Sequence, residues 1–411
     1  MYEAVKIAAL AAGLVLSAAI PARATSAVTA DDTARFLAGM QPSPDSPLTP
    51  LTKDPAWQHH AKFFDGAFSQ LEQRQLSRIR AWADSNLAAP KPTMFYMFSG
   101  PDFLYADAFY SNATTYVLSA LEPPGAVPDL TKMPRGSVDA ALYNIEHSLG
   151  SILSFSFFIT KHMKVDLHAG QLSGALPILY VFMARSGKTI HEVTPVTLDD
   201  QGAVHTDSVG TARGVRITFA GKDGVEKTLY YLSTDLSNSG VKASGFLKFC
   251  ETLAPGNSLI KSASYLLHSG NFTTVRKFIL ANSATIIQDD SGVPLAYYNQ
   301  KKWRFFPFGR YAGPIAEFPG KYQQSYAALF RGAQPIDFGI GYRWRSHESN
   351  LLLSVRLAPD EPSDEVTAAT ASAAPTEALP TRPHPKKPRS PSLFNPQQGF
   401  FNQQRGFFWF R

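Results

Sequence analysis

The sequence predicts an α/β fold in which helices flank a mostly parallel central sheet, with additional antiparallel hairpins. Two apolar runs, Met94–Phe98 and Thr114–Leu121, are short, rich in β-forming residues, and closed by the turn sequences SGPD and EPPG. Such runs are typical of strands buried on both faces. The segment between them, Phe103–Tyr110, is long enough for a short crossover helix. This strand–helix–strand unit is the centre of the predicted sheet.

Further strands are predicted where β-rich runs meet turn residues. Residues 175–198 divide at Ser186-Gly187-Lys188 and predict one hairpin, and Arg213–Ala220 with Glu226–Thr234 predict a second. Residues 283–288 form another short apolar run, which ends at acids and a glycine. Residues 336–345 and 349–357 are predicted to pair as the last two strands.

Helices are predicted from cap residues followed by apolar residues at three- and four-residue spacing. The longest begins at Asp54-Pro55, because Asp is a favoured cap and Pro fits the first helical turn. It continues to about Leu87 with a break at Gly66. The other predicted helix starts are Thr29, Ser137, Ser244, Ser258 and Asn271.

The first residues have the pattern of a secretory signal. Lys6 precedes the apolar run Ile7–Ile20, and Ala22-Arg23-Ala24 supplies a small-x-small cleavage site. The run is shorter than the about 20 residues that span a membrane, so an uncleaved anchor is the less favoured alternative. We expect a signal peptide at residues 1–24, a globular body at residues 25–357, and export to the periplasm or envelope of a bacterium. The single Cys250 excludes intramolecular disulfides, so the apolar core must hold the fold.

Residues 358–411 have the composition of a disordered tail, rich in Ala, Thr, Ser and Pro. The net charge of +6 equals the charge of residues 382–411, which contain no acid and six basic residues: Arg382, Lys386, Lys387, Arg389, Arg405 and Arg411. Just before them, the acids Asp360, Glu361, Asp364, Glu365 and Glu377 offset five of these charges, so the basic excess belongs only partly to the tail. No nucleic-acid partner is expected. The last segment interleaves paired aromatics with arginine and predicts weak membrane-surface binding or self-association through residues 382–411. A merely solvated tail is the alternative.

Four predicted strands end at an acid within a turn. The acids are Asp102, Glu122, Asp235 and Asp289. In an open α/β sheet, ligands bind outside the carboxyl ends of the parallel strands. If these strands share one direction, the four carboxylates gather at one edge and form a candidate site. The alternative is that they are ordinary turn and cap residues, for which Asp is common.

Familiar cofactor and catalytic motifs are incomplete. The first strand–helix–strand unit lacks two of the three glycines of a dinucleotide fingerprint, and Gly187-Lys188-Thr189 lacks the first glycine of a P-loop. Asp290-Ser291-Gly292 matches one half of an aspartic-protease site, which needs two carboxylates. The nearest approach to a metal-ligand pair is Asp166 with His168 on a loop, where surface residues are the favoured interpretation. No cofactor is predicted.

The phrases SGPDFLYADAFY, LEPPG, STDLSNSG, NSLIKSASYL and IIQDDSGVP resemble a group of uncharacterised bacterial exported proteins that carry them in the same order. The resemblance covers nearly the whole body and implies no activity. Two function classes stay open. The favoured one is an envelope protein that binds a small-molecule or envelope ligand, or a partner, at the strand ends. The alternative is a periplasmic hydrolase that uses paired carboxylates at the same rim as acid and base.

Overall fold

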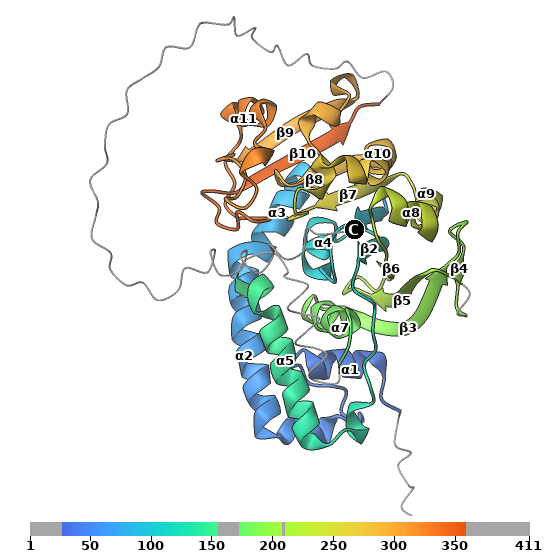
Figure 1. The fold of residues 1–411 in the computed structure, drawn as a ribbon. Helices are drawn as coiled ribbons and strands as arrows, with labels where there is room; N and C mark the ends of the chain where they lie inside the picture. Colours follow the sequence, from blue (N-terminus) through green and yellow to red (C-terminus); the bar gives the residue numbers. More distant parts are fainter. Residues whose placement is uncertain (1–26, 155–171, 208–209, 359–411) are drawn as a thin grey trace, which may run out of the picture.

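A single ten-stranded sheet organises the chain, in the order β4-β3-β5-β6-β2-β1-β7-β8-β10-β9 (Figure 1). The computed structural model describes residues 27–154, 172–207 and 210–358. The strands are β1 (Thr93–Tyr96), β2 (Thr115–Ala120), β3 (Thr189–Leu198), β4 (Val204–His205), β5 (Ala212–Ala220), β6 (Glu226–Ser233), β7 (Gly256–Ile260), β8 (Ser283–Gln288), β9 (Trp303–Gly309) and β10 (Asn350–Arg356).

The five central strands, β6, β2, β1, β7 and β8, are parallel, and antiparallel strands extend the sheet on both sides. Four of the nine strand pairs are parallel and five are antiparallel. The predicted α/β class is therefore confirmed, whereas a mostly parallel sheet describes only its centre. The prediction was wrong for the whole sheet because short apolar runs do not reveal which way their partners run.

Helices cover both faces of the parallel centre, as the complete burial of β1 and β7 requires. Alternate residues of β1 point to opposite sides: Met94 and Tyr96 pack in the core with α4, whereas Phe95, together with Met97 just after the strand, packs in the core with α10. The helices are α1 (Ala30–Leu37), α2 (Pro55–Leu71), α3 (Ser77–Asn86), α4 (Phe103–Phe109), α5 (Arg135–Ser154), α7 (Leu176–Arg185), α8 (Asn238–Ser244), α9 (Phe246–Thr252), α10 (Thr273–Asn282) and α11 (Gln324–Leu329). Helices α2 and α5 run side by side as an arm beside the sheet (Figure 1).

The predicted unit of two strands and a short helix is confirmed as β1–α4–β2. Several other predictions were wrong. The break in the long helix is a π-helical turn at Glu72–Leu76, not Gly66, because an exposed glycine is tolerated within a helix. The first half of the predicted hairpin at residues 175–198 is helix α7, whose continuous burial hides the helical period.

Two further corrections concern the second half of the chain. The segment after Ser258 is not a helix: it contains the end of strand β7 and the turn that follows it. Residues 336–345 form loops, and β10 pairs with β8 and β9 instead. The partners of β10 lie more than 40 residues away in the sequence, which local patterns cannot reveal.

Some predictions concern residues outside the described part of the chain. These are the signal peptide at residues 1–24, the tail from residue 359 onward, and the loop pair Asp166 and His168. Within the described ranges, every helix is too short or too polar to traverse a lipid bilayer. Cys250 is buried in α9, and burial raises the pKa of its thiol well above its ordinary value.

Candidate functional site

The chain changes direction across the sheet between β1 and β7. From β1 it proceeds through α4 to β2 on one side, and from β7 it proceeds through α10 to β8 on the other. The two crossover helices pack on opposite faces of the sheet. Such a switch point separates the loops at the carboxyl ends of two adjacent parallel strands, which is where open α/β sheets bind ligands.

A buried ion pair lies at this switch point. Asp102, in the loop after β1, caps α4 by accepting a hydrogen bond from the Tyr105 amide at 3.2 Å. Lys261 directly follows β7, and its Nζ lies 2.9 Å from Asp102 Oδ2. The two side chains are 2% and 1% exposed. The hydroxyl of Tyr96 donates to the same Oδ2 at 2.9 Å, and the Lys261 ammonium lies 3.8 Å from the centre of the Tyr105 ring.

Two adjacent buried acids follow β8, on the other side of β7. Asp289 accepts hydrogen bonds from the amides of Ser262 and Ser291, each at 3.0 Å, and therefore holds the loops after β7 and β8 together. Asp290 accepts from the hydroxyl of Tyr265 at 2.7 Å and from the side-chain amide of Asn350 at 3.1 Å. Three strand ends, those of β7, β8 and β10, thus meet at the Asp289–Asp290 pair.

The loop after β7 is held in an uncommon backbone conformation. Ser262, Ser264 and Tyr265 have φ values of +53°, +49° and +53°, in the left-handed region that residues other than glycine rarely adopt. Phe98, in the neighbouring loop after β1, has a φ of +65°. Such conformations cost of order 1–3 kcal/mol each and concentrate at functional sites. Both loops of the switch point therefore store strain next to the buried charges.

Burial shifts the protonation of this cluster. It lowers the pKa of the Lys261 ammonium, although the neighbouring Asp102 and Asp289 charges act in the opposite direction. Burial, followed by the charge of Asp289, raises the pKa of the Asp290 carboxyl to about 7. Burial and the Asp102 charge also keep the Tyr96 hydroxyl protonated, because they raise its pKa well above the ordinary value. Asp290 is therefore a carboxyl group that can exchange a proton near neutral pH.

The four acids predicted from the sequence all follow parallel strands of one sheet, and the structure brings two of them to the switch point. Asp102 and Asp289 flank β7, and both act on the charge of Lys261. Glu122 follows β2 and is half-buried, and its backbone carbonyl accepts from Tyr231. Asp235 follows β6 and is exposed, where its carboxylate bonds Ser237 next to helix α8. Asp235 therefore has the contacts of an ordinary turn residue, which was the alternative interpretation.

Sequence reasoning missed Lys261, Tyr96 and Tyr265, and it noted Asp290 only as part of an incomplete aspartic-protease motif. The signal for Lys261 is the apolar pair Leu259-Ile260 soon after Pro255-Gly256, which lies in a buried strand that is followed by a lysine. The serine just before this pair suggested a helix cap instead. Which strand lies beside β1 is decided only by the packing of the whole sheet.

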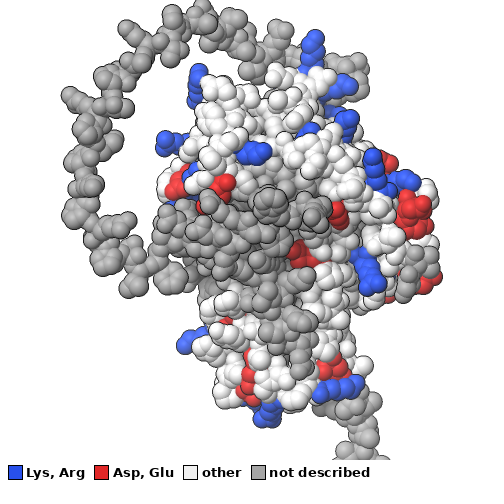
Figure 2. All heavy atoms as spheres, in the orientation of Figure 1, with Lys and Arg blue, Asp and Glu red and all other residues white. Residues whose placement is uncertain are grey.

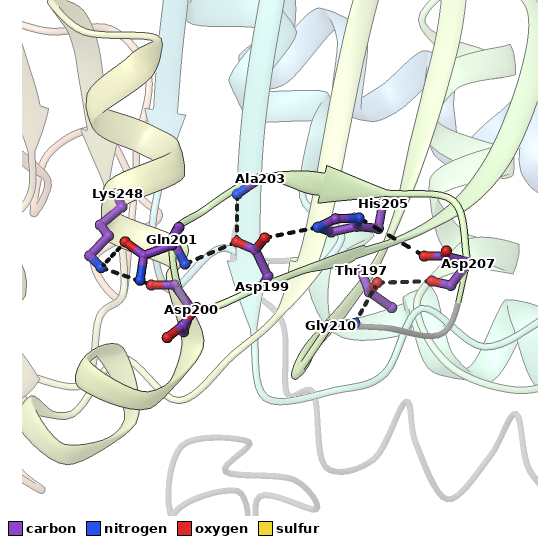
Figure 3. Close-up of polar contacts among 9 residues, drawn as sticks. All are labelled: Thr197, Asp199, Asp200, Gln201, Ala203, His205, Asp207, Gly210 and Lys248. Carbon is purple, nitrogen blue, oxygen red and sulfur yellow. Dashed lines mark hydrogen bonds and ion pairs between the residues drawn. The ribbon is translucent and has the colours of Figure 1, made fainter.

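A second polar cluster lies on the β3–β4 hairpin, near the sheet edge (Figure 3). Asp199 Oδ1 accepts from the amides of Gln201 and Ala203 at 2.9 and 2.8 Å, and its Oδ2 lies 2.9 Å from His205 Nε2. The His205 bond, followed by the Ala203 amide, lowers the pKa of Asp199. These contacts close the turn between two strands, which is a structural role.

Two hollows lie away from the switch point. A cavity of about 40 Å³ lies where α1, α2 and α5 meet, lined in part by Phe36, Trp57 and Leu142. A shallow hollow of about 510 Å³ runs along α3 and includes Arg78 and Asp337. Among the described residues, no three His, Cys, Asp or Glu side chains are arranged to hold a metal ion.

Basic and acidic side chains are interspersed on the face drawn in Figure 2. No family model, curated protein or solved structure matches this chain. The candidate site therefore depends on geometry alone.

Proposed function

We propose that this chain is an exported envelope protein that binds a ligand at the carboxyl ends of β1 and β7. The observation that supports the proposal is the buried charged cluster of Asp102, Lys261 and Asp289 at the switch point, between two loops with left-handed residues. A fold gains little stability from buried charges, because desolvation offsets their attraction. Open α/β sheets bind ligands at this place. The strained backbone and the buried charges found there therefore favour a binding role.

The accessible part of the site is the rim above these charges. Ser262 and Ser264 are half-buried in the strained loop. The Ser262 hydroxyl oxygen is buried just below this rim and has no hydrogen-bond partner among the described residues, which is uncommon for a buried polar group. Tyr265 stands beside them and packs against Phe318 at 4.9 Å and Tyr342 at 6.3 Å between ring centres. An apolar aromatic wall with a few polar groups is the usual composition of a small-molecule site.

The test is a binding screen with the full exported chain. The probes are free amino acids, disaccharides and soluble fragments of bacterial cell wall, and binding is measured by thermal shift and native mass spectrometry. Ser262→Tyr would fill the rim and should weaken binding of a hit at least tenfold. Ser69→Tyr, on the exposed surface of α2, is the matched control and should bind normally. If both variants bind the hit equally well, the ligand does not bind at the switch point.

Hydrolysis is the second candidate, and one observation favours it. The Asp290 carboxyl, with a pKa of about 7, adjoins the Asp289 carboxyl, whose pKa burial also raises. Two adjacent carboxyl groups that share a proton can act as an acid–base pair. The assay uses p-nitrophenyl acetate, phosphate and glycosides as substrates. Hydrolysis is favoured if the wild type turns over one of these substrates and Asp290→Asn abolishes the turnover while it still binds the hit from the screen. If the wild type turns over none of these substrates, hydrolysis is refuted and ligand binding remains the proposed function.

A further inference from the structure

The positive charge of the described body is concentrated near its C-terminal end. Residues 297–358 contain nine Lys or Arg residues and three Asp or Glu residues, whereas the other described residues contain twenty and twenty-three. This segment includes β9, α11 and β10, and β9 is the last strand at one edge of the sheet. At the top of Figure 2, where Figure 1 draws β9 and α11, the charged side chains in view are basic.

Five of these basic residues make no ion pair with an acid of the described chain. All are exposed or half-buried, and they are Lys301, Lys302, Arg310, Lys321 and Arg331. Two of the three acids in the segment are already paired. Asp337 lies 3.9 Å from Arg78 of α3, and Glu348 lies 3.6 Å from Arg343 and 3.5 Å from Arg345. The five charges therefore remain available to a partner outside the chain.

The five cations lie at the two ends of β9. Lys301 and Lys302 directly precede the strand, and Arg310 directly follows it, so they are separated by roughly 25 Å along the chain. Arg331 lies near the end of β9, because the amide of the nearby Gln334 donates to a β9 carbonyl at 3.0 Å. The charges are therefore spread along the edge of the sheet and are not gathered at one point.

An exposed tyrosine lies among the cations at the end of β9. Tyr322 is 54% exposed and follows Lys321, and its ring stacks on Tyr311, the neighbour of Arg310, at 5.6 Å between ring centres. Tyrosine is enriched where proteins meet the surface of a bilayer, because its ring is apolar and its hydroxyl is polar. Basic side chains beside such a ring fit the headgroup layer of anionic lipids.

We propose that this basic surface, formed by the five cations and Tyr322, docks the protein on a bilayer of anionic phospholipids. A bilayer presents its phosphates as an extended plane, which matches charges spread along a sheet edge. The surface is separate from the ligand site, since β8 and β10 lie between β7 and β9 in the sheet. The chain also leaves the described body here, because the Leu357 amide donates to the Lys302 carbonyl at 3.1 Å. Residues 382–411, with six basic residues and paired aromatics, follow in the sequence and can contact the same bilayer.

Sedimentation of the full chain with lipid vesicles tests this inference. The vesicles are phosphatidylcholine alone or with about one third phosphatidylglycerol, and the wild type should prefer the anionic ones. Each Lys or Arg near an anionic surface strengthens binding about fivefold. The double variant Lys301→Gln with Lys302→Gln should therefore weaken binding about 25-fold. The independent triple variant Arg310→Gln, Lys321→Gln and Arg331→Gln should weaken it about a hundredfold. Wild-type binding should also weaken as salt rises from about 0.1 to about 0.5 M.

The matched control is the triple variant Lys53→Gln, Lys62→Gln and Lys242→Gln. These lysines are exposed, make no ion pair within the described chain and lie outside residues 297–358, so this variant should bind like the wild type. An equal loss in the control would mean that only total charge matters and would overturn the proposal.

Three other results would also overturn it. The first is a wild type that does not prefer anionic vesicles. The second is wild-type binding by both surface variants, which keep residues 382–411, since attachment would then belong to the tail. The third is a DNA duplex that binds the wild type as tightly as anionic vesicles of the same phosphate concentration, because the partner would then be a polyanion and not a bilayer.

Discussion

Replacing Lys261 by Met removes the cation that neutralises Asp102 inside the protein. The two charged atoms are 2.9 Å apart and the side chains are 1% and 2% exposed, so water cannot replace the ammonium. Breaking a buried pair by removing one partner costs about 3–5 kcal/mol, because an uncompensated charge stays behind. This is a large part of the about 5–15 kcal/mol by which proteins are stable. We therefore expect Lys261→Met to lower the melting temperature by roughly 10 °C.

The assay is urea unfolding followed by circular dichroism, with thermal unfolding as a second measurement. Lys132→Met is the matched control, since Lys132 and Asp129 are 3.0 Å apart but 82% and 36% exposed, and it should leave the midpoint unchanged. The double variant Asp102→Asn with Lys261→Met should recover part of the loss, because no buried charge is left. A Lys261→Met variant within about 1 kcal/mol of the wild type would refute the reasoning, since it would mean that water reaches Asp102.

Three more predictions concern the same edge of the sheet. Because the folded state raises the pKa of Asp290 from 3.8 to about 7, it holds a proton that the unfolded chain has lost, and wild-type stability should fall as the pH rises from about 4 to about 7. Asp290→Asn should flatten this part of the curve in unfolding experiments at several pH values, and an unchanged curve would assign the slope to another group. Ser262→Gly should raise the unfolding free energy by up to about 1 kcal/mol, because glycine adopts a φ of +53° without strain; a loss of stability would contradict this. Gly341→Ala would place a methyl carbon 1.7 Å from Asp289 Oδ2 at a φ of +66° and should cost at least about 2 kcal/mol, whereas Gly320→Ala, in open space, should unfold like the wild type.

The centre of the fold could be predicted from the sequence because its strands are marked locally. The runs Met94–Phe98 and Thr114–Leu121 combine β-forming residues with turn residues at their ends, and both contain a strand. The caps Thr29 and Asp54 bond the amides of Asp32 and Ala56, so the starts of α1 and α2 could also be predicted. Runs such as Leu176–Arg185 failed, because a buried helix and a buried strand are equally apolar.

Local patterns were sufficient to predict that acids follow β1, β2, β6 and β8, since the turn residues that end a strand are local signals. The packing of the whole sheet places β7 between β1 and β8, and this order brings Asp102, Lys261 and Asp289 together. The same order leaves Asp235 exposed at the end of β6. Strand order depends on which faces of distant elements pack together, and these contacts leave no pattern in neighbouring residues.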